Sequence, residues 1–202
     1  MTDSNDGDAL RRAWARFGGT CGLLGIVAYA LAAFAPLPGQ ATLALAFAFG
    51  PLLAVGAIGL RRQLMVFGRR PLLDTAAVFA VAGGVTLLSM LSVQQALFAA
   101  FDGGDMAAPV REGFNAVHYG LDVAWDVLVS SAVVLFGIAM LRGGAGLKAM
   151  GAAGIVLGLL LLGFNLAEFP HPPASQGSID WGPFVALWLA GMFGWLWLRG
   201  RR

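Results

Sequence analysis

The chain has 202 residues, of which 58% are hydrophobic and 12% are charged, and its formal net charge is +2. Soluble domains carry about 25% charged residues, so this composition excludes an ordinary soluble protein and indicates a chain that is dissolved in lipid. The basic residues are spread in small groups along the chain, and we expect no nucleic-acid partner.

The amino-terminal segment differs from the rest of the chain. Its first ten residues, MTDSNDGDAL, are polar and acidic, and we expect residues 1–16 to form a disordered cytoplasmic tail. A secretory signal would need a positive first region and a cleavage site of small residues, and neither is present here. The single cysteine, Cys21, cannot form an internal disulfide and is expected to pack as a small apolar side chain.

Long apolar segments fill residues 17–198, and short charged or Pro/Gly-containing breaks separate them. Each segment is near the span of about 17 to 25 residues that a helix needs to cross a bilayer. The segments are continuous and rich in Leu, Ala and Gly, which favours helices over the alternating strands of a β-barrel. The predicted fold is therefore all-α, a polytopic integral membrane six-helix bundle, with spans at 17–36, 41–60, 72–100, 114–141, 149–168 and 181–198.

Every second connection between these spans is basic. Arginines precede the first span, lie between the second and third spans, and form the tail at 199–202, whereas the alternate connections carry mainly Asp and Glu. The positive-inside rule then places the N- and C-termini in the cytoplasm, in a multi-pass protein of the cytoplasmic membrane. The arginines themselves are expected to anchor the chain to the lipid bilayer.

The fourth span carries a polar stripe on an otherwise apolar helix. Helical spacing places Asn115, His118, Asp122 and Asp126 within an arc of about 80°. A carboxylate at the centre of a transmembrane helix costs about 2.5 to 3.5 kcal/mol on insertion scales. We therefore expect the two aspartates to face the interior of the bundle, where they suit the handling of a proton or cation.

Polar residues of three other spans fall at a similar depth, in the outer half of the membrane. Together with the stripe they predict an outward-facing acidic pocket that binds a proton, a cation or a small ligand, as in a transporter, channel or sensor. The predicted ligand- or proton-binding residues are Gln94, Gln95, Asn115, His118, Asp122, Asp126, Asn165, Glu168 and Asp180.

Two other interpretations of the same residues stay open. His118 and Asp122, at i and i+4, together with Glu168 and His171, could hold a transition metal such as zinc. The protein would then be an intramembrane metal-assisted hydrolase acting on a lipid-like substrate; otherwise no cofactor is expected. Alternatively, the polar side chains only form hydrogen bonds between helices in an accessory or structural subunit. A homo-oligomer is compatible with each interpretation.

Two stretches resemble a known group of proteins. The fourth span contains HYGLDVAWDVL, and the chain continues through FNLAEFPHPPASQGSIDWGPFVALW near its end. With six short-looped spans, this pattern is similar to small multi-pass bacterial membrane proteins whose domain is of unknown function. The resemblance covers spans three to six best and implies a bacterial inner-membrane setting, with no activity or catalytic residue.

Overall fold

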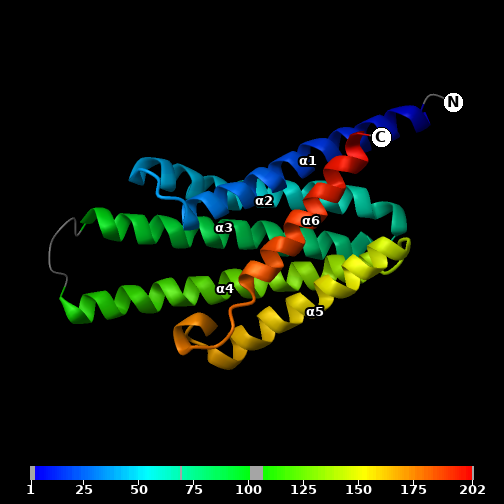
Figure 1. Cartoon of the computed structure of the whole chain (residues 1–202). Helices are drawn as coiled ribbons and strands as arrows, with labels where there is room; N and C mark the ends of the chain where they lie inside the picture. Colours follow the sequence, from blue (N-terminus) through cyan, green and yellow to red (C-terminus); the bar gives the residue numbers. More distant parts are fainter. Residues whose placement is uncertain (1–2, 69, 101–106, 202) are drawn as a thin grey trace.

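The structure is a computed structural model that describes residues 3–68, 70–100 and 107–201. The described residues form six α-helices and two short 3-10 helices (Figure 1). In chain order these are α1 (Asp3–Phe34), α2 (Gly39–Leu64), η1 (Met65–Phe67), α3 (Arg70–Ala100), α4 (Ala108–Met140), α5 (Ala145–Glu168), η2 (Pro173–Gln176) and α6 (Gly182–Arg201). The part of the chain that is described contains no β-strand, and the predicted all-α fold is confirmed.

Five helices, α1 to α5, are long and apolar enough to cross a membrane. Their positions match the first five predicted spans, because continuous runs of Leu, Ala and Val satisfy the backbone only as helices in lipid. Helix α6 has 20 residues, and two of them are arginines in its last turn. It is not among the five helices that meet this measure of length and composition.

Helix α1 starts earlier than the sequence predicts. It begins at Asp3, so residues 3–16 are helical and the predicted disordered tail is wrong for them. The C-terminal part of this segment packs against the bundle. Ala15 is buried, and the Arg62 guanidinium of α2 lies 4.5 Å from the centre of the Trp14 ring.

The helices form a closed ring. Each helix packs against the next one along the chain, and the last helix, α6, also packs against the first, α1. Figure 1 shows α6, in orange and red, crossing the bundle diagonally to reach α1. The ring brings side chains from all six helices toward one interior.

The two ends of the bundle differ in charge. One end, here called the terminal end, holds the N-terminal part of α1, the C-terminal part of α6 and the α2–α3 and α4–α5 connections (Figure 1). The other, here called the hairpin end, holds the α1–α2 and α5–α6 connections, the C-terminal part of α3 and the N-terminal part of α4. Arginines gather at the terminal end, where Arg199 and Arg201 lie over the rings of Trp195 and Trp197. The predicted orientation also used Arg69, Asp102, Asp105 and Arg202, which lie outside the described residues.

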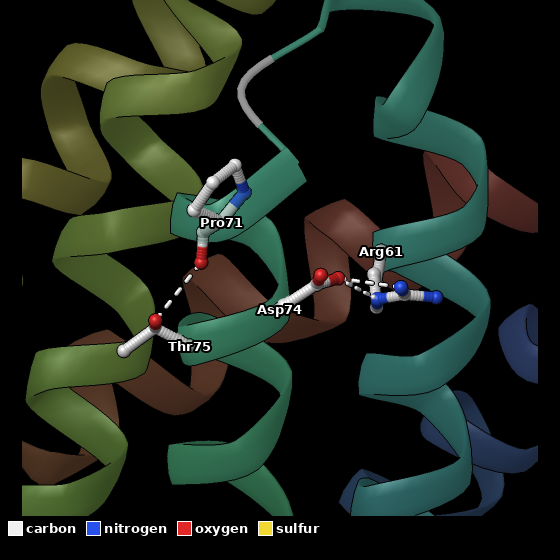
Figure 2. Close-up of polar contacts among 4 residues, drawn as sticks. All are labelled: Arg61, Pro71, Asp74 and Thr75. Carbon is white, nitrogen blue, oxygen red and sulfur yellow. Dashed lines mark hydrogen bonds and ion pairs between the residues drawn. The ribbon is translucent and has the colours of Figure 1, made fainter.

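An ion pair joins α2 and α3 at the terminal end. Figure 2 shows Asp74 facing the Arg61 side chain, and Asp74 Oδ1 accepts a hydrogen bond from Arg61 Nε at 2.5 Å. The next residue of α3, Thr75, donates a hydrogen bond from Oγ1 to the carbonyl of Pro71 at 2.9 Å. The first contact links two helices, whereas the second satisfies a hydroxyl within a single helix.

Glycines allow the helices to approach closely. A Cβ atom added at Gly84 of α3 would lie 2.6 Å from the carbonyl oxygen of Gly50 in α2. The same relationship holds between α5 and α4, where a Cβ at Gly151 would lie 2.6 Å from the carbonyl oxygen of Gly137. Backbone contact of this kind is how helices associate when lipid removes the hydrophobic driving force.

Candidate functional site

A cavity of about 230 Å³ lies in the interior of the ring, in the half nearer the hairpin end. All six helices contribute to its wall, and the turn at Pro172 and Pro173 closes one side. Most of the wall is apolar, formed by residues such as Leu87, Met90 and Leu189. Acidic and aromatic side chains make up the remainder.

Helix α4 supplies the acidic side of the cavity. Asp122, Trp125, Asp126 and Val129 all line it, and their spacing of three and four residues places them on one helical face. This face is the inner part of the polar stripe predicted from the sequence. The structure turns it toward the ring interior because the opposite face carries apolar side chains.

Asp126 is tied to α5 by a hydrogen bond. Asn165, which is fully buried, donates from Nδ2 to Asp126 Oδ2 at 3.0 Å. The same Nδ2 donates to the carbonyl of Leu161 at 3.0 Å, so both amide protons are used. The contact fixes one oxygen of Asp126 against the wall of the cavity.

Asp122 is held differently. It lies one helical turn from Asp126 and lines the same cavity, yet no described residue donates a hydrogen bond to it, and His118, one turn away, interacts with it electrostatically. Its side chain is half-buried. A half-buried carboxylate with no protein donor has its oxygens available for water or for a ligand.

Asp180 completes a set of three carboxylates. It lies just before α6 and lines the cavity, while its Oδ1 accepts a hydrogen bond from the backbone N–H of Gly182 at 2.8 Å. This bond satisfies one of the free N–H groups at the start of α6. The start of α6 therefore fixes Asp180, which is exposed to solvent, on the wall of the same cavity as the aspartates of α4.

Glu168 and His171 lie in or beside the α5–α6 connection. Glu168 Oε1 accepts a hydrogen bond from Ser178 Oγ at 2.8 Å, which holds the connection closed. The His171 ring packs edge-on against Tyr119, with 5.8 Å between ring centres. Neither residue lines the cavity.

His118 lies one turn beyond Asp122 toward the hairpin end. Its ring centre is 5.9 Å from that of Tyr119, and its Nδ1 is buried with no hydrogen-bond partner among the described residues. Within residues 3–68, 70–100 and 107–201, no group of three His, Cys, Asp or Glu side chains is arranged to hold a metal ion. The predicted set of His118, Asp122, Glu168 and His171 stays a prediction.

The other predicted residues lie away from the cavity wall. Gln94 and Gln95 are half-buried in α3, and Asn115 is exposed near the start of α4. The structure thus brings together Asp122, Asp126, Asn165 and Asp180, and it leaves Gln94, Gln95, Asn115, His118 and Glu168 outside the lining. Their roles in binding stay predictions.

Aromatic residues are the part of the site that the sequence does not reveal. Tyr29 of α1, Phe49 of α2 and Trp125 of α4 line the cavity. Trp125 could have been found from its position three residues after Asp122. Tyr29 and Phe49 are far from Asp122 in the sequence, and no pattern marks them as site residues. Only the order of helices around the ring brings α1 and α2 beside α4.

Comparisons of the chain with protein-family models, curated proteins and solved structures found no match.

Proposed function

We propose that this chain is a six-span protein of the cytoplasmic membrane, with both termini in the cytoplasm, and that its cavity binds a cation or proton from the outer side. Such a site belongs to a transporter, channel or sensor. The bacterial inner-membrane setting implied by the resemblance is part of the same proposal.

The length and position of α6 support the sixth span. Twenty residues at 1.5 Å per residue reach about 30 Å, which matches the hydrocarbon thickness of a bilayer. Helix α6 crosses the bundle diagonally, from beside the end of α5 to the N-terminal part of α1 (Figure 1), and its last turn carries arginines at the terminal end. Placing these arginines in the cytoplasm follows the positive-inside rule.

One observation carries the binding proposal. Three carboxylates, Asp122, Asp126 and Asp180, line one cavity, and none of the described residues that line it is Lys, Arg or His. Asp122 and Asp126 are partly buried and one turn apart, so their charges repel more strongly than they would in water, whereas Asp180 is exposed to solvent. A cation or bound protons would relieve this repulsion, so the cavity favours positive charge.

The orientation is tested by labelling single cysteines. Glycines 113 and 146 have open space where a side chain would extend, and they lie at opposite ends of the bundle. With Cys21 replaced by Ala, Gly113→Cys is expected to react with a membrane-impermeant maleimide on intact cells. Gly146→Cys should react only after permeabilisation. The reverse pattern would contradict the proposed orientation.

Binding is tested by difference infrared spectroscopy of the protein in lipid vesicles. Changing the pH, or adding Na⁺, K⁺, Ca²⁺ or an alkylammonium salt, should alter carboxyl bands that disappear in Asp122→Asn or Asp126→Asn. Asp74→Asn is the matched control, because Asp74 lies at the terminal end in an ion pair with Arg61. If no pH change and no added cation affects the bands of Asp122 and Asp126, the proposal is wrong.

A further inference from the structure

The cavity has an aromatic wall as well as an acidic one. The rings of Tyr29 and Phe49 lie 5.0 Å apart between centres, and those of Phe49 and Trp125 lie 5.8 Å apart. The three rings form a continuous surface contributed by α1, α2 and α4. Because Asp122 and Asp126 flank Trp125 on one face of α4, carboxylate oxygens and aromatic faces meet in the same space.

This combination discriminates between kinds of cation. A bare Ca²⁺ or Mg²⁺ ion takes six or more oxygen ligands. The cavity wall carries three carboxylates and the Tyr29 hydroxyl, but one oxygen of Asp126 is bound to Asn165 and, among the described residues, the carboxylates are not grouped closely enough to hold one metal ion. The remainder of the wall is mostly hydrocarbon and aromatic, and it offers few ligands to a bare metal ion. An alkylammonium ion has the opposite needs, since its positive charge is attracted by carboxylates and ring faces while its alkyl groups pack against apolar side chains.

We propose that the cavity binds a small organic ammonium ion, an inference that rests on the proposed function and names its ligand class. The ammonium group lies between Asp122 and the faces of Tyr29 and Trp125, and its alkyl groups contact Met90 and Leu189. Drug-sized ligands occupy pockets of about 300 to 1,000 Å³. A cavity of about 230 Å³ therefore selects a smaller cation.

Asp126 and Asp122 have different parts in this arrangement. One oxygen of Asp126 already accepts a hydrogen bond from Asn165, whereas no described residue donates a hydrogen bond to Asp122. Asp122 is therefore the carboxylate that pairs with the ammonium group. Asp126 adds negative charge one turn deeper, and Asp180 adds it from the start of α6.

The test is calorimetric titration of the full chain in lipid nanodiscs with choline. The matched neutral compound is 3,3-dimethylbutan-1-ol, which has nearly the same shape without the charge. Choline should bind and the alcohol should not. Asp122→Asn should weaken choline binding at least tenfold, and Trp125→Leu should weaken it about 2- to 30-fold.

Further variants distinguish weaker binding that is caused by removing an aromatic ring from weaker binding that is caused by misfolding. Trp125→Phe keeps a ring and should retain part of the affinity. Tyr29→Leu should weaken binding in the same range as Trp125→Leu, and the partial exposure of Tyr29 makes this change tolerable for folding. Trp197→Leu, at the terminal end over Arg201, should leave the affinity unchanged.

Two results would overturn the inference. Equal binding of the neutral alcohol would show an apolar pocket with no preference for positive charge. Absence of choline binding, while pH or inorganic cations still alter the bands of Asp122 and Asp126, would exclude an organic ammonium ligand and leave the proposed function standing. Absence of every response would exclude both.

Discussion

Asn165 of α5 donates a hydrogen bond to Asp126 of α4 at 3.0 Å, and the Asn165 side chain is completely buried. The bond joins two neighbouring helices of the ring beside the acidic cavity. It also explains how a carboxylate can lie deep in an apolar bundle, because a buried polar group is costly chiefly when it lacks a partner.

The first prediction concerns the strength of this bond. A double-mutant cycle with Asn165→Ala and Asp126→Ala should give a coupling free energy of about 0.5 to 2 kcal/mol, the range found for hydrogen bonds between transmembrane helices. The measurement is reversible unfolding in mixed micelles for the four proteins. Additive effects of the two substitutions would show that the bond contributes nothing to stability.

The second prediction concerns the contact between α2 and α3. Gly84→Ala places a methyl group against the backbone of Gly50, where a carbonyl cannot move aside, and should destabilise the fold by about 1 to 3 kcal/mol. Gly163→Ala is the matched control, since nothing lies within 4 Å of its added Cβ. Because alanine favours helix, the control should unfold at an equal or higher temperature. Equal loss of stability in both variants would contradict this account.

The third prediction concerns the docking of α6 on α5. Trp188 Nε1 donates to the carbonyl of Met150 at 2.8 Å, and its ring lies against Gly154, where a Cβ would be 2.6 Å from the ring. Trp188→Phe removes the donor and should cost about 0.5 to 1.5 kcal/mol. Gly154→Ala should displace the ring and shift its fluorescence emission. Unchanged stability and emission in the two variants would rule out this packing.

The fourth prediction concerns the Arg61–Asp74 ion pair (Figure 2). The two side chains are 28% and 50% exposed, so water screens their attraction. Asp74→Asn should change the free energy of unfolding by less than about 1 kcal/mol, and the difference should shrink further at 1 M salt. A larger or salt-independent loss would show that the pair is shielded from solvent in the membrane.

Local pattern alone predicts much of this protein. Each of the six predicted spans falls within or close to one helix, because long apolar runs are stable as helices, although α1 begins well before its span, at Asp3. The spacing of Asp122 and Asp126 predicts a shared inward face, and the structure places both on the cavity wall. The cost of a carboxylate in lipid is a property of one helix, so a single sequence can reveal it.

The predicted site residues that do not line the cavity differ from the aspartates for one physical reason. Gln94, Gln95 and Glu168 are expected at a depth similar to that of the aspartates, yet none lines the cavity. Depth along a helix is fixed by its sequence, but rotation about its axis depends on its neighbours. Asn165 reaches Asp126 because α5 packs against α4, and hydropathy carries no information about that contact.

The sequence by itself determined the apolar composition typical of a membrane protein, the helices and the acidic stripe. Each of these follows from composition and helical spacing within one segment. Only the tertiary structure decided that α6 closes the ring against α1 and that Tyr29 and Phe49 face the aspartates of α4. These relationships depend on which small residues let two backbones meet, as Gly50 and Gly84 do. Helix order arises from contacts between segments far apart in the chain, and no single segment encodes it.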